Sequence, residues 1–290
     1  MHIAGTKGKG TTCLYTEHLI EAHRPLYGRP NKLGCLTSPH VTTVRERFRI
    51  DSKPVSESAF THHFWSLWDR MGMSDRGRTT PANHPPAPPW PRYPGFLTLL
   101  GFYIFSQESV DLVILETGMG GETDSTNVVT APIATGITRI GLDHTDRLGK
   151  TVREIAWHKA GILKYQVPAF SVPQERTAED VLQARALEKG CSIEFVQDEF
   201  LVKNNIHVWP NIHFQHMNAA LAVELVRAYF AQLTPPRDVD PFVAMELART
   251  DLPAKFELVG DGSNDWLLSS AHNEQSIDGA CQAFLDLLQQ

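Results

Sequence analysis

The stretch that decides the fold reads Gly5-Thr6-Lys7-Gly8-Lys9-Gly10-Thr11-Thr12. It follows a short apolar segment and precedes a segment of helical periodicity, so that a strand, a glycine-rich turn and a helix come in that order. The backbone N–H groups of the turn and the positive end of the helix dipole then face a common anion. We expect residues 5–12 to bind phosphate groups, with Lys9 at the terminal phosphates and the Thr11 hydroxyl on Mg²⁺. The alternative is a flexible, lysine-rich loop.

Beyond this turn, short runs rich in Val, Ile and Leu alternate with segments of helical period. Strands are expected at 110–115, 133–140, 167–172 and 192–197, and helices at 11–23, 96–107, 151–163, 178–189 and 215–233. The expected helix at 151–163 has a strong start signal, because Thr151 and Glu154 form a capping box. This alternation is typical of βαβ units, so the sequence predicts an α/β fold with a parallel-rich sheet and helices on both faces.

The 290 residues suggest about two domains. Seven prolines between Pro81 and Pro94 cannot form a central strand or helix, and we interpret them as an insertion in a first domain of residues 1–245. Two further strands, at 255–259 and 266–268, are expected to begin a second domain at 246–290. Since about 40 residues are too few for an independent core, we expect this domain to be incomplete and the chain to be cut at both ends.

Composition narrows the function. With 27 Lys and Arg against 33 Asp and Glu, the net charge of -6 provides no global basic field for nucleic acid or an anionic membrane. No run of 18 or more apolar residues occurs, so no membrane span is expected. The four cysteines, Cys13, Cys35, Cys191 and Cys281, form no C-x-x-C pair, which favours a reducing compartment. With no signal peptide recognised, we expect a cytoplasmic protein.

Acidic side chains follow two of the expected strands. Glu116 ends the 110–115 strand and would project at the carboxyl edge of the sheet, where ligands bind. A carboxylate opposite a phosphate-binding turn can hold Mg²⁺ directly or through water; the alternative is a solvated strand end. The next strand is followed by Asp143 and His144, either of which can complete a second metal site, although an Asp-His pair is also a common turn device.

Lys159 lies on or beside the apolar stripe of the expected 151–163 helix. A buried ammonium costs several kcal/mol unless it is paired or neutralised. We therefore expect Lys159 to pair with phosphate or carboxylate, or to lose its charge covalently. The alternative is a side chain that extends to solvent.

Three weaker signals complete the set of candidates. Ser38 follows an expected strand at 32–36 and can serve as a ligand for metal or phosphate. The arginines of the charged stretch 45–49 can grip an acidic substrate, although such a run is more often a solvated face. Asn218 can read an adenine edge near a helix start, although such an asparagine often only caps.

Taken in order, these segments resemble the folylpolyglutamate synthases of the Mur ligase superfamily, in their eukaryotic form. The matching stretches are 3–11, 36–41, 44–47, 96–100, 111–121, 124–127, 141–145 and 155–164. The resemblance implies a P-loop ATPase domain followed by the beginning of a Rossmann-like domain. It also implies a monomer that uses ATP and Mg²⁺ to add L-glutamate to the γ-carboxylate of folate through an acyl phosphate.

The resemblance assigns roles to particular residues. It implies metal sites at Ser38, Glu116 and His144 and a carbamylated lysine at Lys159, and it places Lys9, Lys159 and His272 in catalysis and residues 5–12, Asn218 and Lys255 at the nucleotide. The chain departs from the family pattern at Ile212-His213-Phe214-Gln215, at Leu252-Pro253-Ala254-Lys255 and at Ser269-Ser270-Ala271-His272. The alternative to a ligase is a truncated, non-catalytic paralogue that binds nucleotide.

Overall fold

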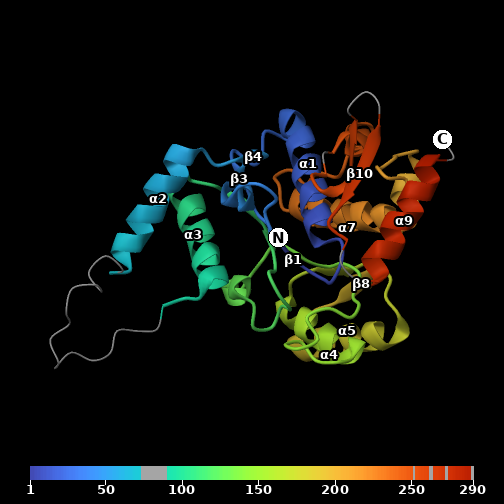
Figure 1. Ribbon diagram of the computed structural model, residues 1–290, viewed down its shortest axis with the longest axis horizontal. Helices are drawn as coiled ribbons and strands as arrows, with labels where there is room; N and C mark the ends of the chain where they lie inside the picture. The colour runs from blue at the N-terminus through green and yellow to red at the C-terminus, as the bar shows by residue number, and fades with distance from the viewer. Residues whose placement is uncertain (73–89, 251, 261–263, 272–273, 289–290) are drawn as a thin grey trace.

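The computed structural model describes residues 1–72, 90–250, 252–260, 264–271 and 274–288. One sheet of eight strands organises most of this chain (Figure 1). Its strands are β1 (His2–Ala4), β2 (Leu33–Leu36), β3 (Phe48–Ile50), β4 (Lys53–Pro54), β5 (Leu112–Glu116), β6 (Thr135–Ile137), β7 (Ala169–Ser171) and β8 (Ile193–Phe195). Their order across the sheet is β4-β3-β2-β5-β1-β6-β7-β8. The six strands from β2 to β8 in this order are parallel, and β3 and β4 add an antiparallel edge.

Helices cover both faces of this sheet, as expected for an α/β fold. They are α1 (Lys9–Tyr27), α2 (Glu57–Arg70), α3 (Tyr93–Gln107), α4 (Val152–Lys159), α5 (Arg176–Lys189), α6 (Glu199–Lys203), α7 (His213–Phe230), α8 (Pro241–Ala244) and α9 (Glu274–Leu288), with 3-10 turns η1 (Val44–Arg47), η2 (Ser125–Val128), η3 (Ala160–Ile162) and η4 (Met245–Arg249). Helices α1 and α7 pack together on one face, while the α2–α3 and α4–α5 pairs lie on the other (Figure 1). The fold class predicted from the sequence is therefore confirmed.

Each face of the sheet has its own apolar core, because successive residues of a strand point to opposite sides. Ile3 and Ile114 belong to the core beneath α1 and α7. Ala4 lies in the core beneath α4 and α5, and Leu115 in the one beneath α2 and α3. The central strands are thus buried on both faces, which is why they read as short continuous apolar runs.

Strand register positions the candidate site. Ile3 pairs with Glu116 of β5, and Ala4 pairs with Ile137 of β6. Because β1, β5 and β6 are parallel, the turn after Ala4, the loop after Glu116 and the loop after Ile137 all leave the same edge of the sheet. This is the carboxyl edge, where open α/β sheets bind ligands.

The expected elements differ from the observed ones mainly at their ends. Helix α1 begins at Lys9 rather than at residue 11, since Gly8, at a left-handed φ of 91°, is its N-cap. The expected 151–163 helix divides into α4 and η3, and its capping box is confirmed. The two strands expected after residue 250 are present as an antiparallel pair, β9 (Lys255–Gly260) and β10 (Asp265–Ser269), and α9 follows them.

Some expectations concern residues that the structure does not describe. The proline-rich segment falls largely outside the described residues, and of it the structure describes only residues 90–94, in which α3 begins at Tyr93. His272 also lies outside them. Within the ranges given above, none of the helices combines the length and apolar character that a membrane crossing needs.

Candidate nucleotide-binding site

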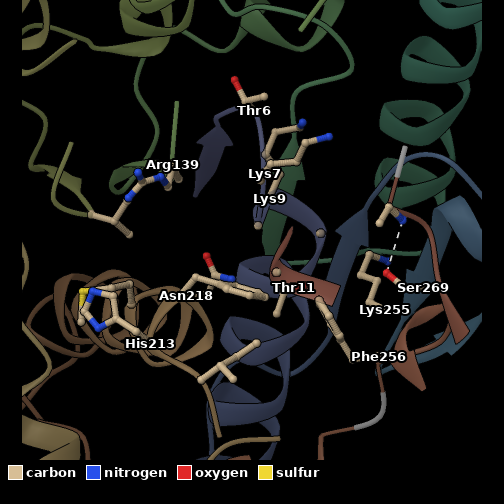
Figure 2. Close-up of a pocket in the computed structure, with 18 of the residues that line it drawn as sticks. Thr6, Lys7, Lys9, Thr11, Arg139, His213, Asn218, Lys255, Phe256 and Ser269 are labelled. Carbon is tan, nitrogen blue, oxygen red and sulfur yellow. Dashed lines mark hydrogen bonds between the residues drawn. The ribbon is translucent and has the colours of Figure 1, made fainter. Parts of the chain in front are cut away.

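A cavity of about 540 Å³ opens at the carboxyl edge of the sheet. The turn after β1, the first turns of α7, the β9–β10 pair and α9 enclose it (Figure 2). Its lining residues are Thr6, Lys7, Gly8, Lys9, Gly10, Thr11, Glu116, Arg139, Val172, Pro173, Ile212, His213, Phe214, Met217, Asn218, Lys255, Phe256, Ser269, Ser270, Ala271, Asp278, Gly279 and Gln282. The cavity is polar and cationic at the turn and largely apolar toward α7.

The glycine-rich turn presents unpaired donors to this cavity. The N–H groups of Thr6 and Lys7 both donate to the Arg139 carbonyl, at 2.9 and 3.1 Å. In the described part of the chain, the N–H groups of Lys9, Gly10 and Thr11 have no hydrogen-bond partner, as expected for the first turn of a helix. Three donors and the positive end of the α1 dipole therefore converge on one place, which suits an anion.

Two glycines leave room for other side chains at the turn. At Gly8 the backbone is left-handed, and a Cβ would collide with the Asn218 side chain. At Gly10 a Cβ would lie 3.0 Å from Lys255 Cε and 3.5 Å from Glu116 Oε2. The absence of side chains at these positions lets Asn218, Lys255 and Glu116 lie close to the turn.

Two lysines converge on the carbonyl of Gly5. The Lys9 ammonium donates to it at 3.1 Å, and Lys159 Nζ donates to it at 2.6 Å. Lys159 is 3% exposed, so it does not extend to solvent. Burial, with the neighbouring Lys9 charge, lowers the pKa of Lys159 well below its usual range. Lys159 lies one layer behind the turn and does not line the cavity.

Glu116 is the acidic group of the site. It is 5% exposed and accepts a hydrogen bond from the Ser38 N–H at 2.9 Å. Burial raises the pKa of its carboxyl group, and the nearby Lys9, Lys255 and Arg49 charges oppose that rise. Thr11 shares the cavity with Glu116, whereas Ser38 contacts Glu116 from outside the lining. This donor set of carboxylate and hydroxyl oxygens fits a hard cation such as Mg²⁺.

His144 lies apart from this group. It is exposed, its backbone is left-handed with a φ of 50°, and its N–H donates to the Asp143 side chain at 2.9 Å. It does not line the cavity, although Asp143 is tied to the turn by an ion pair with Lys7 at 3.5 Å. Among the described residues, no group of three or more His, Cys, Asp or Glu side chains is arranged to hold a metal.

The predicted residues of α7 and α1 divide between the cavity and the core. Asn218 lines the cavity, and its Nδ2 donates to Gln215 Oε1 at 2.9 Å. Asn218 lies in the second turn of α7, whose N-cap is Ile212, so it does not cap the helix. The Thr12 hydroxyl points away from the cavity and donates to the Asn218 carbonyl at 3.5 Å.

The arginines of 45–49 are engaged within the protein. Arg49 Nη2 donates to Glu17 at 2.6 Å in a buried ion pair, Arg45 donates to the Val55 carbonyl and Arg47 donates to His40. The stretch is neither a solvated face nor part of the cavity, because it forms η1 and the strand β3, which pairs with β2 and β4.

Sequence reasoning missed the apolar end of the cavity. Phe214 and Phe256, whose ring centroids lie 5.5 Å apart, line it together with Val172 and Pro173. These residues come from α7, β9 and the loop after β7, and the tertiary fold alone brings them together. Arg139 was also missed, although its position just after β6 resembles that of Glu116 at the end of β5.

Comparisons with known proteins agree with this geometry. No protein-family model matches the chain. The folylpolyglutamate synthase of Neurospora crassa is 37% identical over 291 residues, covering 99% of this chain and 54% of the relative. The mitochondrial folylpolyglutamate synthase of Bos taurus is 35% identical over 312 residues, covering 99% of this chain and 51% of the relative. The chain therefore spans about half the length of the curated relatives it matches.

Solved structures give the same result. A folylpolyglutamate synthase structure described as a complex with AMPPCP and folate aligns with a TM-score of 0.81 and 27% identity, covering 100% of this chain and 71% of that one. Sequence and fold thus agree over nearly the whole of this chain. Over nearly its whole length, the chain is therefore similar in sequence and in fold to about half the length of the folylpolyglutamate synthases.

Proposed function

We propose that this chain binds ATP in the cavity and takes part in the ATP-dependent addition of L-glutamate to the γ-carboxylate of folate. The observation that carries the proposal is the convergence of three free N–H groups, Lys9 and Glu116 on one end of a cavity whose other end is apolar. A triphosphate matches the cationic end and a nucleobase matches the apolar end. A relative whose structure is described with AMPPCP and folate supports the same assignment.

The phosphate end would be held by this chain's own donors. Lys9 Nζ is bonded to the Gly5 carbonyl, from which it can turn to the terminal phosphates. Lys255 approaches the turn at Gly10 and adds a second cation from β9. A lysine lacks the fork of an arginine, so it would contact phosphate as a point charge.

Mg²⁺ would be held by Glu116 and the Thr11 hydroxyl, with Ser38 beside them. The ion would supply charge neutralisation of the phosphates as the γ-phosphoryl group leaves. His144, the third metal ligand that the resemblance implies, would have to turn inward from its exposed loop. We therefore propose Glu116 and Thr11 as the metal ligands of the site. Metal binding by His144 and Ser38 stays a prediction from the resemblance.

The proposed reaction has two steps that balance. A carboxylate oxygen of folate attacks the γ-phosphorus, the bond to the β-phosphate oxygen breaks, and an acyl phosphate and ADP form. The amine of glutamate then attacks the acyl carbon, inorganic phosphate leaves, and the nitrogen loses a proton as the amide forms. Because negative charge moves onto a leaving phosphate oxygen in both steps, the fixed donors of the turn act by positioning and by electrostatic stabilisation.

Lys159 would support this site as a carbamate. Burial lowers the pKa of its ammonium group and so favours the amine, which can take up carbon dioxide to give an anionic carbamate and release a proton. We propose that this is how the buried lysine loses its positive charge, in agreement with the role that the resemblance implies.

The test is ADP release by the purified chain in the presence of Mg²⁺, ATP, tetrahydrofolate and L-glutamate. We expect ADP only when both the acid and the amine are present, together with a folate product whose mass increases by one glutamate residue. Binding of ATP without such turnover would overturn the ligase assignment and leave a nucleotide-binding protein. A panel of other acids and amines would show whether the substrates differ from folate and glutamate.

A further inference from the structure

A buried arginine on α5 lies outside the cavity and has no role in the proposed reaction. The Arg185 side chain is 7% exposed. Its Nη2 donates to the Glu122 carboxylate, and its Nη1 donates to both oxygens of Glu188 at 2.8 and 2.7 Å. Its guanidinium lies 4.4 Å from the ring centroid of Trp157 on α4. A buried guanidinium with this many partners holds several segments together.

Glu122 packs closely against the end of α4 and the turn that follows it. Its N–H donates to the His158 carbonyl at 2.7 Å. The preceding residue, Gly121, has no room for a side chain, since a Cβ would lie 2.6 Å from the His158 oxygen and 2.7 Å from the Lys159 oxygen. A Cβ on Gly161 would collide with the Glu122 backbone. The loop after β5 and the end of α4 are therefore in close backbone contact.

This contact leads directly to Lys159. Trp157 and Lys159 are two residues apart on α4, and Arg185 holds this segment both through the Trp157 ring and through Glu122. Lys159 Nζ then reaches the Gly5 carbonyl at the start of the phosphate-binding turn. The chain of contacts runs from α5 to the turn without a gap.

We propose that Arg185 is a positioning residue that holds Lys159 against the phosphate-binding turn through Glu122 and Trp157. The catalytic consequence of this role rests on the proposed function, whereas the placement of Lys159 does not. Removing the guanidinium would leave the partly buried Glu122 carboxylate with Lys189, at 3.4 Å, as its ion-pair partner among the described residues, and would free the Trp157 ring. A lysine at this position would restore the charge but not the fork or the stacking.

The test is an acylation footprint of Lys159. Wild-type protein, Arg185→Met and Arg185→Lys are treated with an amine-acylating ester, and the labelling rate of Lys159 is followed by peptide mass spectrometry. We expect the rate to rise about tenfold or more in Arg185→Met as the segment opens locally, and by an intermediate amount in Arg185→Lys. Arg176→Met is the matched control, because Arg176 is exposed on the same helix and pairs with Asp180. It should label like the wild type.

A second probe separates positioning from general loss of structure. Cys13 and Cys35 are buried in the core beneath α1, so their rate of alkylation reports global opening. We expect that rate to stay unchanged in Arg185→Met. If this variant fails to fold, Glu122→Gln, which removes the charge that Arg185 binds, replaces it with the same expectation. A Lys159 that stays as protected as in the wild type in a folded variant would overturn the proposal.

Nucleotide turnover completes the experiment. We expect Arg185→Met to lower the kcat of ADP release more than it raises the KM for ATP, because Lys159 lies behind the cavity rather than in it. An exposed Lys159 with unchanged turnover would leave the positioning role intact and would count against a role for Lys159 in the proposed reaction. If neither the labelling rate of Lys159 nor the rate of ADP release changes, the positioning role of Arg185 is refuted, whereas the proposed function is not affected.

Discussion

Replacing Gly10 with alanine separates the stability of the turn from its capacity to bind phosphate. Gly10 lies in the first turn of α1 and does not have a positive φ, so alanine is compatible with its backbone. The new methyl group would lie 3.0 Å from Lys255 Cε, 3.4 Å from Lys255 Nζ and 3.5 Å from Glu116 Oε2. The closest neighbour is the end of a flexible side chain, which can move by a few tenths of an ångström. The fold therefore accommodates the change.

The two expected effects have opposite signs. Alanine in place of glycine in a helix favours the folded state by about 0.5–1 kcal/mol, partly offset by the displacement of Lys255. The methyl group, however, takes up cavity space beside Lys255 and Glu116, where the phosphates are proposed to bind. A hydrogen bond to a charged group contributes about 1.5–3 kcal/mol, so losing one weakens binding by about tenfold to a hundredfold.

The assay is calorimetric titration with AMPPCP and Mg²⁺, together with urea denaturation. We expect Gly10→Ala to unfold at the same or higher urea concentration than the wild type and to bind the nucleotide at least about tenfold more weakly. Gly28→Ala is the control, since Gly28 ends α1 at a φ of 67° with nothing within 4 Å of its Cβ position. That variant should lose about 1 kcal/mol of stability and keep its affinity. Undiminished nucleotide affinity in Gly10→Ala would refute the placement of the phosphates at this turn.

Three further predictions concern buried charged groups. Arg49→Met removes the ion-pair partner of Glu17, whose side chain is 3% exposed. Urea denaturation should show a loss of about 3–5 kcal/mol of unfolding free energy. Adding Glu17→Gln should recover part of that loss, and additive losses in the double variant would contradict the pairing. Burial lowers the pKa of His2 to about 3, below its value of 6.5 in an unfolded chain. The free energy of unfolding should therefore fall by about 1.4 kcal/mol per pH unit as the pH decreases from 6.5 toward 3. His2→Asn should flatten this slope, and an unchanged slope would exclude His2 as its cause. Burial raises the pKa of Glu116, so the stability that its protonated form contributes is lost as the pH rises through this raised pKa. Glu116→Gln should therefore be more stable than the wild type at pH 7 but should bind Mg²⁺-nucleotide more weakly. Reduced stability of the variant at pH 7 would contradict the predicted direction of the effect.

Local patterns identified residues that the fold brings close together. The glycine spacing of the turn, Glu116 at the end of a buried strand and Lys159 on an apolar stripe each carry their signal within a few residues. The parallel register then brings these segments to one edge of the sheet. Helical periodicity left open whether Lys159 is buried or extends to solvent, and the structure shows it buried.

Other features depended on contacts between distant residues. The Arg49 pair joins residues 32 positions apart, so a charge run that suggested a solvated face or a substrate contact ends in a paired strand of the sheet with a buried ion-pair partner. The apolar end of the cavity combines Phe214 with Phe256 of another segment. His144 follows a strand as Glu116 does, but a left-handed turn directs it to solvent. Sequence periodicity contains no information on such turns or on which distant segments meet.

The central claim is that the turn at residues 5–12 holds the phosphates of a nucleotide. The most direct measurement is calorimetric titration of Mg²⁺-ATP into the wild type and into Lys9→Ala. We predict binding by the wild type and at least about tenfold weaker binding by the variant, because the variant loses the cation nearest the terminal phosphates. Equal affinity in the two proteins would contradict the claim and would reduce the family likeness to a record of common ancestry.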